Sequence, residues 1–129
     1  ALGAPRIPGE RVASRIEFEL QRDFGQWIKA RGETPQRLRL TSAGVTIEPD
    51  LYVPESGWVV EAKKSPAREY VRTAIGQVLD YSLLARESGR PATPVVLLPS
   101  RPIAHIEGLL SELEILLVVR DGEGFLVIE

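Results

Sequence analysis

Apolar residues recur at helical spacing in two stretches of the chain, and this predicts two long helices. The first spans Arg11 to Ala30 and should end at Gly32, because glycine is common just past a helix terminus. The second follows Ser65-Pro66, where serine would cap the helix and proline would occupy its first turn, and it closes at Glu87-Ser88-Gly89. The apolar stripes are Val12, Ile16, Leu20, Phe24, Trp27 and Ile28 in the first helix, and Val71, Ala74, Ile75, Val78 and Leu79 in the second.

Shorter runs between and after these helices have the pattern of strands. Gln36 to Thr41 alternates, with Leu38 and Leu40 on one face, and Ser42-Ala43-Gly44 turns the chain toward a strand that ends at Pro54. The C-terminal part predicts a buried strand, a short helix and two strands joined by a turn at 121–124. Their ranges are Thr93 to Leu98, Pro102 to Ser111, Glu114 to Val119 and Phe125 to Ile128. This order of elements predicts an α/β sandwich.

Two of the strand-like runs, Glu48 to Val53 and Gly57 to Lys64, are joined by residues typical of a turn and predict a hairpin. If the turn is centred between residues 55 and 56, then Asp50 lies opposite Glu61. Side chains alternate along a strand, so Lys63 shares a face with these two carboxylates. The opposite face is wholly apolar and consists of Leu51, Val53, Trp58, Val60 and Ala62.

Opposed carboxylates are unfavourable without a cation. At roughly 5 Å and an effective dielectric constant near 20, their repulsion is on the order of 3 kcal/mol. Magnesium binds one or two carboxylates together with water and phosphate oxygens, so the Asp50–Glu61 pair predicts a metal site that is open to phosphate. Lys63 would direct an ammonium at the same place, where it could orient or deprotonate a water molecule. The alternative interpretation is an edge hairpin that carries solvated charges on its outer face.

These residues resemble the motif of the PD-(D/E)xK nucleases, which have the restriction-endonuclease-like fold. The matching positions are Pro49, Asp50, Glu61, Ala62 and Lys63. Gln77 and Tyr81 also resemble the Q-x-x-x-Y helix of the RecB-type and lambda-exonuclease-type members. The resemblance runs from about Glu10 to Pro99, and it implies an αβββαβ core with a mixed central sheet flanked by helices. An extra C-terminal helix and strands would follow this core.

The resemblance also implies an activity and a set of site residues. The chain would be a Mg²⁺-dependent DNA endonuclease domain, the cleavage module of a restriction-type enzyme, with Mn²⁺ able to substitute. Asp50, Glu61 and the Ala62 carbonyl oxygen would bind the metal, and Lys63 would act on the attacking water. The other implied positions are Glu17 and Gln77 in the catalytic site, and Lys64, Arg68, Arg72 and Tyr81 on DNA. Glu10 and Glu19 remain alternatives to Glu17, because all three glutamates lie on the first helix.

Composition limits the remaining classes of protein. A chain of 129 residues with 43% hydrophobic content forms one domain, expected at 10–129 after a linker-like segment at 1–9. There is no cysteine, and His105 is the single histidine, which excludes disulfide frameworks, Cys/His zinc sites and His-based nuclease centres. We expect a cytoplasmic protein that does not enter membranes. The absence of methionine, even at position 1, suggests a fragment of a longer protein.

The charge distribution bears on partners. The net charge is −2, with an acidic excess in residues 103–129 and a slight basic excess before them. One basic cluster is Lys29, Arg31, Arg37 and Arg39, and the other surrounds Lys63. Such a weakly charged domain gives little nonspecific affinity for DNA, so we expect a separate recognition domain, and a homodimer for double-strand cleavage. Two alternatives stay open: an exonuclease or junction resolvase of the same superfamily, and a non-catalytic scaffold that binds nucleic acid or protein.

Overall fold

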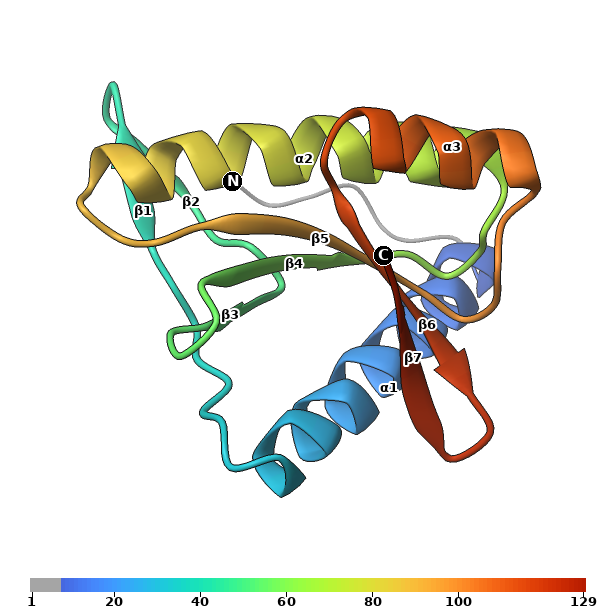
Figure 1. The fold of residues 1–129 in the computed structure, drawn as a ribbon. Helices are drawn as coiled ribbons and strands as arrows, with labels where there is room; N and C mark the ends of the chain where they lie inside the picture. Colours follow the sequence, from blue (N-terminus) through green and yellow to red (C-terminus); the bar gives the residue numbers. More distant parts are fainter. Residues whose placement is uncertain (1–7) are drawn as a thin grey trace.

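The computed structural model describes the backbone of residues 8–129 and the side chains of residues 15–129. A five-stranded mixed sheet lies between two layers of helix, with α1 on one face and α2 and α3 on the other (Figure 1). The elements are α1 (Pro8–Ala30), β1 (Leu40–Ser42), β2 (Val45–Ile47), β3 (Leu51–Val53), β4 (Trp58–Ala62), α2 (Arg68–Glu87), β5 (Thr93–Leu98), α3 (Ala104–Glu112), β6 (Leu116–Asp121) and β7 (Gly124–Ile128). The expected linker-like segment falls outside the described residues as far as position 7.

The main sheet has the strand order β3-β4-β5-β6-β7. Its three central strands are parallel, and β3 and β7 pair antiparallel at the two edges. The connections between the parallel strands are α2 and α3, which lie on the same face of the sheet (Figure 1). The expected mixed α/β fold with a central sheet flanked by helices is therefore confirmed.

Each face of the sheet has its own apolar core, and both cores use the helical stripes read from the sequence. On the α1 side, Phe24 is fully buried and stacks on Trp27 and Trp58, with ring centroids 5.6 and 6.3 Å away. On the α2 side, buried helix residues pack against Val96 and Leu98 of β5. Both stripes were predicted too wide, because Ile16 is 41% exposed and Leu79 is 38% exposed. No helix of the described residues is long and apolar enough to cross a membrane.

The region before the hairpin differs from the prediction. β1 and β2 form a separate two-stranded sheet around the turn Ala43-Gly44, whose φ angles are 51° and 79°. The expected strand from Glu48 begins three residues later, at Leu51, because Pro49 has no N–H to donate and interrupts the pairing. Three strands were expected before the second helix. Two of them, β3 and β4, belong to the main sheet, whereas β1 pairs with β2 outside it.

The predicted start of the second helix was also wrong. Ser65 does not cap it: the Ser65 hydroxyl accepts a hydrogen bond from the Ala67 N–H at 3.1 Å, and Ala67 is the N-cap. The helix end was predicted correctly, because α2 stops at Glu87 and Gly89 adopts a φ of 84°. Of the C-terminal elements, β5 has its predicted bounds, whereas the helix and both strands that follow are shifted by one or two residues.

Candidate active site

The β3–β4 hairpin has the register that the sequence predicted. Leu51 pairs with Val60 and Val53 pairs with Trp58, which continues to Asp50 opposite Glu61. The turn depends on Gly57, which has a φ of 77°. A Cβ at Gly57 would lie 3.1 Å from the Pro91 backbone, so glycine is required both by conformation and by space.

A reciprocal pair of hydrogen bonds fixes the two carboxylates. The Asp50 N–H donates to Glu61 Oε1 at 3.0 Å, and the Ala62 N–H donates to Asp50 Oδ2 at 2.9 Å. Each carboxylate is thus held by the backbone of the other strand. These bonds leave Asp50 Oδ1 and Glu61 Oε2 for other partners. No sequence pattern predicts these two hydrogen bonds, which tie the geometry of the site to the hairpin register.

Glu61 is buried in the folded protein, with 3% of its surface exposed. Burial, and then the negative charge of the Asp50 side chain and its hydrogen bonding with Glu61, raise the pKa of Glu61 to about 9, while the Asp50 backbone N–H and Lys63 act in the opposite direction. Two adjacent carboxylates that cannot both ionise on their own fit a divalent cation, which would remove the cause of the raised pKa. The residues present therefore fit a hard metal ion with oxygen ligands.

The residues 15–129, whose side chains the structure describes, contain no group of three or more His, Cys, Asp or Glu side chains that could hold a metal. A cation at Asp50 and Glu61 would need further oxygen ligands that are not such side chains. The Ala62 carbonyl oxygen, water and a substrate phosphate are the ligands of this kind that the sequence predicted.

The first helix brings Glu17 to this site. Burial raises the pKa of Glu17; among the charges around it, Lys63 and Lys64 lower this pKa and Asp50 raises it. Glu17 is thus within electrostatic reach of the hairpin residues. Glu19 is exposed, and Glu10 lies outside the residues whose side chains are described. The structure therefore selects Glu17 by position, and its role stays a prediction.

The second helix contributes Gln77 and Tyr81 from the opposite side. Burial, and then the Glu61 charge, raise the pKa of Tyr81, while a hydrogen bond from the Gln77 side chain lowers it. The Gln77 Oε1 atom is buried and has no hydrogen-bond partner among the described residues. A buried acceptor without a partner is unfavourable and would be satisfied by a donor that enters the site.

The basic residues predicted to contact DNA lie beside this site. Lys64 Nζ is 4.9 Å from the centroid of the Tyr70 ring, whereas Arg68 and Arg72 are exposed on the first turns of α2. The other basic cluster is divided. Arg39 pairs with Glu48 at 2.8 Å, and Arg31 packs over Trp27 at 4.5 Å, while Lys29 and Arg37 line a groove next to Asp50.

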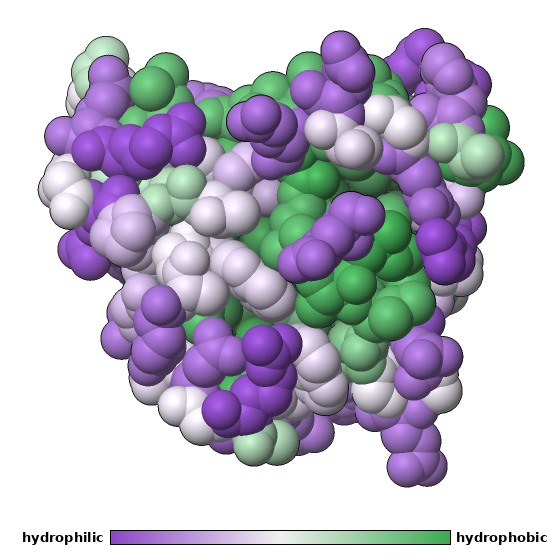
Figure 2. Space-filling model, viewed as in Figure 1, coloured by the Kyte–Doolittle hydropathy of each residue, from purple (hydrophilic) through white to green (hydrophobic). Residues whose placement is uncertain are grey.

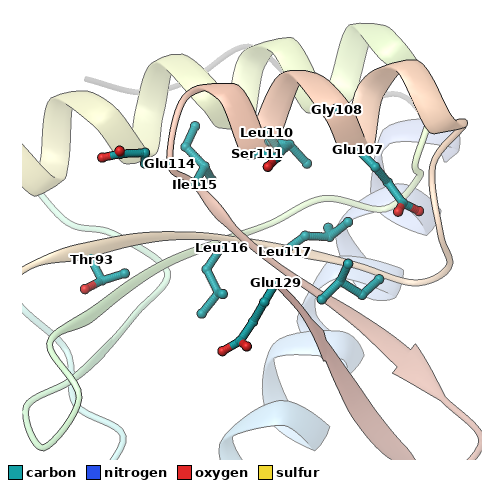
Figure 3. Close-up of a pocket in the computed structure, with 11 residues that line it drawn as sticks. Thr93, Glu107, Gly108, Leu110, Ser111, Glu114, Ile115, Leu116, Leu117 and Glu129 are labelled. Carbon is teal, nitrogen blue, oxygen red and sulfur yellow. The ribbon is translucent and has the colours of Figure 1, made fainter.

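A cavity of about 450 Å³ lies in a different place. It lies between α3 and the strands β5, β6 and β7, within an apolar area of the surface (Figures 2 and 3). Its lining is mostly apolar, and its acidic residues are Glu107, Glu114 and Glu129. Glu107 is already paired with Arg101 at 2.8 Å. The cavity includes none of the predicted catalytic residues, so volume alone does not locate the chemistry.

No family model matches the chain, and no curated protein matches it in sequence. Among solved structures it is similar to an XisH family protein from Nostoc punctiforme PCC 73102, with a TM-score of 0.63 and 15% sequence identity. The match covers 85% of this chain and 98% of the other. At this identity the similarity concerns the fold alone. The fold is consistent with the restriction-endonuclease-like α/β class.

Proposed function

We propose that the chain is a metal-dependent DNA endonuclease domain that hydrolyses phosphodiester bonds. The observation that supports this most strongly is the Asp50–Glu61 pair, held by reciprocal hydrogen bonds with Glu61 buried. Keeping two carboxylates opposed inside a protein is unfavourable unless a cation accompanies them. The nuclease-like fold supports the same proposal.

Each residue of the site has a separate task in this mechanism. Asp50, Glu61 and the Ala62 carbonyl would hold Mg²⁺, which supplies a Lewis acid for the phosphate and a more acidic water. The Lys63 ammonium, next to Glu61, orients the attacking water and offsets negative charge as the phosphorus gains a ligand. Glu17 attracts the Lys63 ammonium electrostatically and favours its orientation toward the site. Gln77 offers its buried Oε1 to a donor from the substrate or from the water.

An exonuclease or junction resolvase is the second candidate, and the Gln77–Tyr81 pair favours it. These side chains lie on the Glu61 side of the site, as the resemblance to the Q-x-x-x-Y helix implies. The purified chain should be incubated with supercoiled and with linear plasmid in Mg²⁺ or Mn²⁺. An endonuclease nicks or linearises the supercoil, whereas an exonuclease degrades only the linear form. No hydrolysis of either plasmid form, or of a four-way DNA junction assayed beside them, would refute both candidates.

Glu17→Ala should lower the cleavage rate at least about tenfold, which corresponds to about 1.4 kcal/mol of transition-state stabilisation. The reason is that Glu17 lies within electrostatic reach of Asp50 and Lys63. Glu19→Ala is the matched control, because Glu19 is exposed on the same helix, and it should keep the wild-type rate. Initial rates of plasmid nicking would measure both. Equal rates for the two variants would remove Glu17 from the site.

The chain should bind short duplex DNA weakly, with a Kd in the nonspecific range of about 10⁻⁴ to 10⁻⁶ M at physiological salt. The physical reason is that acidic residues outnumber basic ones, 18 to 16, so the chain has no excess of positive charge to attract phosphates. Fluorescence anisotropy with duplexes of several sequences would measure this. Tight binding to one sequence would show that the chain carries its own recognition surface.

A further inference from the structure

A groove beside Asp50 has a composition unlike that of the larger cavity under α3. It has a volume of about 400 Å³ and lies between α1 and residues 35–37, with Asp50 and Leu51 at the start of β3. We call it the α1 groove. Its outer wall is held by two backbone hydrogen bonds between Gln36 and Tyr52, at 2.7 and 2.9 Å. The groove is therefore attached to the same strand that presents Asp50.

One face of α1 forms the other wall. Phe18, Arg22, Gly25 and Lys29 line the groove, and their spacing places them on a single side of the helix. From Phe18 to Lys29 this face runs roughly 17 Å along the helix axis. Such a length suits an extended ligand rather than a compact small molecule.

Gly25 keeps this wall open. A Cβ built at Gly25 would find nothing within 4 Å, so no packing contact inside the protein requires glycine there. Glycine in a helix interior destabilises the helix relative to alanine. The absence of a side chain at this position instead leaves space in the α1 groove.

The charges of the groove suit an anion. Arg22, Lys29 and Arg37 line it together with three glutamine amides, and Asp50 is the single acidic residue among the described lining positions. Neither Lys29 nor Arg37 forms an ion pair with any side chain that the structure describes. Arg22 is paired with Asp23 at 3.1 Å, so Lys29 and Arg37 are the lining cations that remain for an anion. Cations beside Asp50 are the charge pattern expected for a phosphodiester backbone that leads to a metal site.

Phe18 adds an aromatic surface. It lies on the groove wall and is 64% exposed, although exposing a large apolar side chain is unfavourable. Its neighbour in sequence, Glu17, interacts electrostatically with Asp50 and Lys63 of the candidate site. Exposed aromatic rings beside cations stack on unpaired bases, and paired bases do not offer their faces in this way.

We propose that the α1 groove binds an unpaired DNA strand, with Phe18 stacked on a base and Lys29 and Arg37 on phosphates. This rests on the proposed nuclease function and narrows its substrate to DNA with a single-stranded segment beside the cleaved bond. The strand enters along α1 and reaches Asp50.

Binding can be measured without cleavage. Fluorescence anisotropy of a labelled short oligonucleotide in EDTA, single-stranded or annealed to its complement, gives Kd for the 129-residue chain and its variants. Phe18→Ala should weaken single-strand binding roughly 5- to 150-fold, as expected for the loss of one stacked base. Lys29→Gln and Arg37→Gln should each reduce the salt dependence of log Kd by about 0.7. Ile103→Ala, at a site 62% exposed, and Arg90→Gln are matched controls and should not change single-strand binding.

Gly25→Leu separates groove blockage from misfolding. Because a Cβ at Gly25 meets nothing within 4 Å, the variant should still melt cooperatively as a folded protein, and it should lose single-strand affinity at least about tenfold. Wild-type single-strand affinity in both Phe18→Ala and Gly25→Leu would overturn the proposal, as would a preference for the duplex. If the chain cleaves plasmid but fails these tests, the groove proposal is wrong and the nuclease function stands. If it passes them but cleaves neither plasmid nor a duplex with a single-stranded gap, the nuclease function is wrong and the groove proposal stands.

Discussion

Lys63→Ala should slow plasmid cleavage by about 10² to 10⁴-fold, the usual contribution of a positioned acid or base. Its affinity for Mn²⁺ should remain within a few-fold of the wild-type value, because Lys63 is not a metal ligand. Asp50→Ala and Glu61→Ala should lose both cleavage and metal binding, since each removes a carboxylate of the pair. Isothermal titration calorimetry with Mn²⁺, combined with nicking rates, measures the two properties separately.

Lys64→Ala is the comparison for this result. The Lys64 ammonium lies over the Tyr70 ring and is predicted to contact DNA rather than the water. The variant should therefore need more DNA for half-maximal rate while its rate at saturating DNA stays near that of the wild type. If Lys63→Ala instead nicks DNA at the wild-type rate, the assignment of Lys63 to the attacking water is wrong.

The metal-free wild type should lose stability as the pH rises between 4.5 and about 9, the ordinary and raised pKa values of Glu61. In this range the folded Glu61 keeps its proton and the unfolded one loses it, so the folded state binds more protons and is weakened by rising pH. Glu61 alone contributes a slope of at most about 1.4 kcal/mol per pH unit, or about 5 °C in melting temperature. Glu17, whose pKa is also raised by burial, adds to the loss as the pH rises above 4.5. Asp23, Glu55 and Glu107 have lowered pKa values, so they affect the pH dependence of stability only below this range.

Asp50→Asn provides the control for this effect. Asparagine can still accept the hydrogen bond from the Ala62 N–H, but it removes the negative charge that helps to raise the pKa of Glu61. In EDTA above neutral pH the variant should therefore melt higher than the wild type. Millimolar Mg²⁺ should stabilise only the wild type, because a ligand that binds the folded state deepens its free-energy minimum. Equal destabilisation of the variant with and without Mg²⁺ would make Asp50 a structural residue alone.

The hairpin and the helical stripes could be read from the sequence because their causes are local. A turn that requires glycine at position 57 sets the register, and the register alone places Asp50 opposite Glu61. The errors arose where a local signal had two readings. Ser65 could cap a helix or bond to the Ala67 N–H before it, and the second occurs.

The rest of the site depends on how distant elements pack, and no local pattern carries that information. Glu17 and Glu19 lie at similar angles from the apolar stripe of the first helix, one on each flank, so the wheel does not separate them. Only the packing of α1 on the sheet makes Glu17 the half-buried one. The reciprocal hydrogen bonds of Asp50 and Glu61 also require the assembled hairpin. The α1 groove joins residues of a helix, a loop and a strand start, so its lining is not contiguous in sequence.

The most direct test of the central claim is cleavage of supercoiled plasmid by the wild type and by Asp50→Asn, purified in parallel and assayed with Mg²⁺ and with EDTA. The opposed carboxylates, the metal they would hold and the adjacent Lys63 predict nicked or linear product from one of the four reactions, the wild type with Mg²⁺. Product in EDTA, or equal product from both proteins with Mg²⁺, would mean that the activity does not come from this site. No product in any reaction, and none from a duplex with a single-stranded gap assayed in parallel, would contradict the proposed nuclease function itself when both proteins are folded.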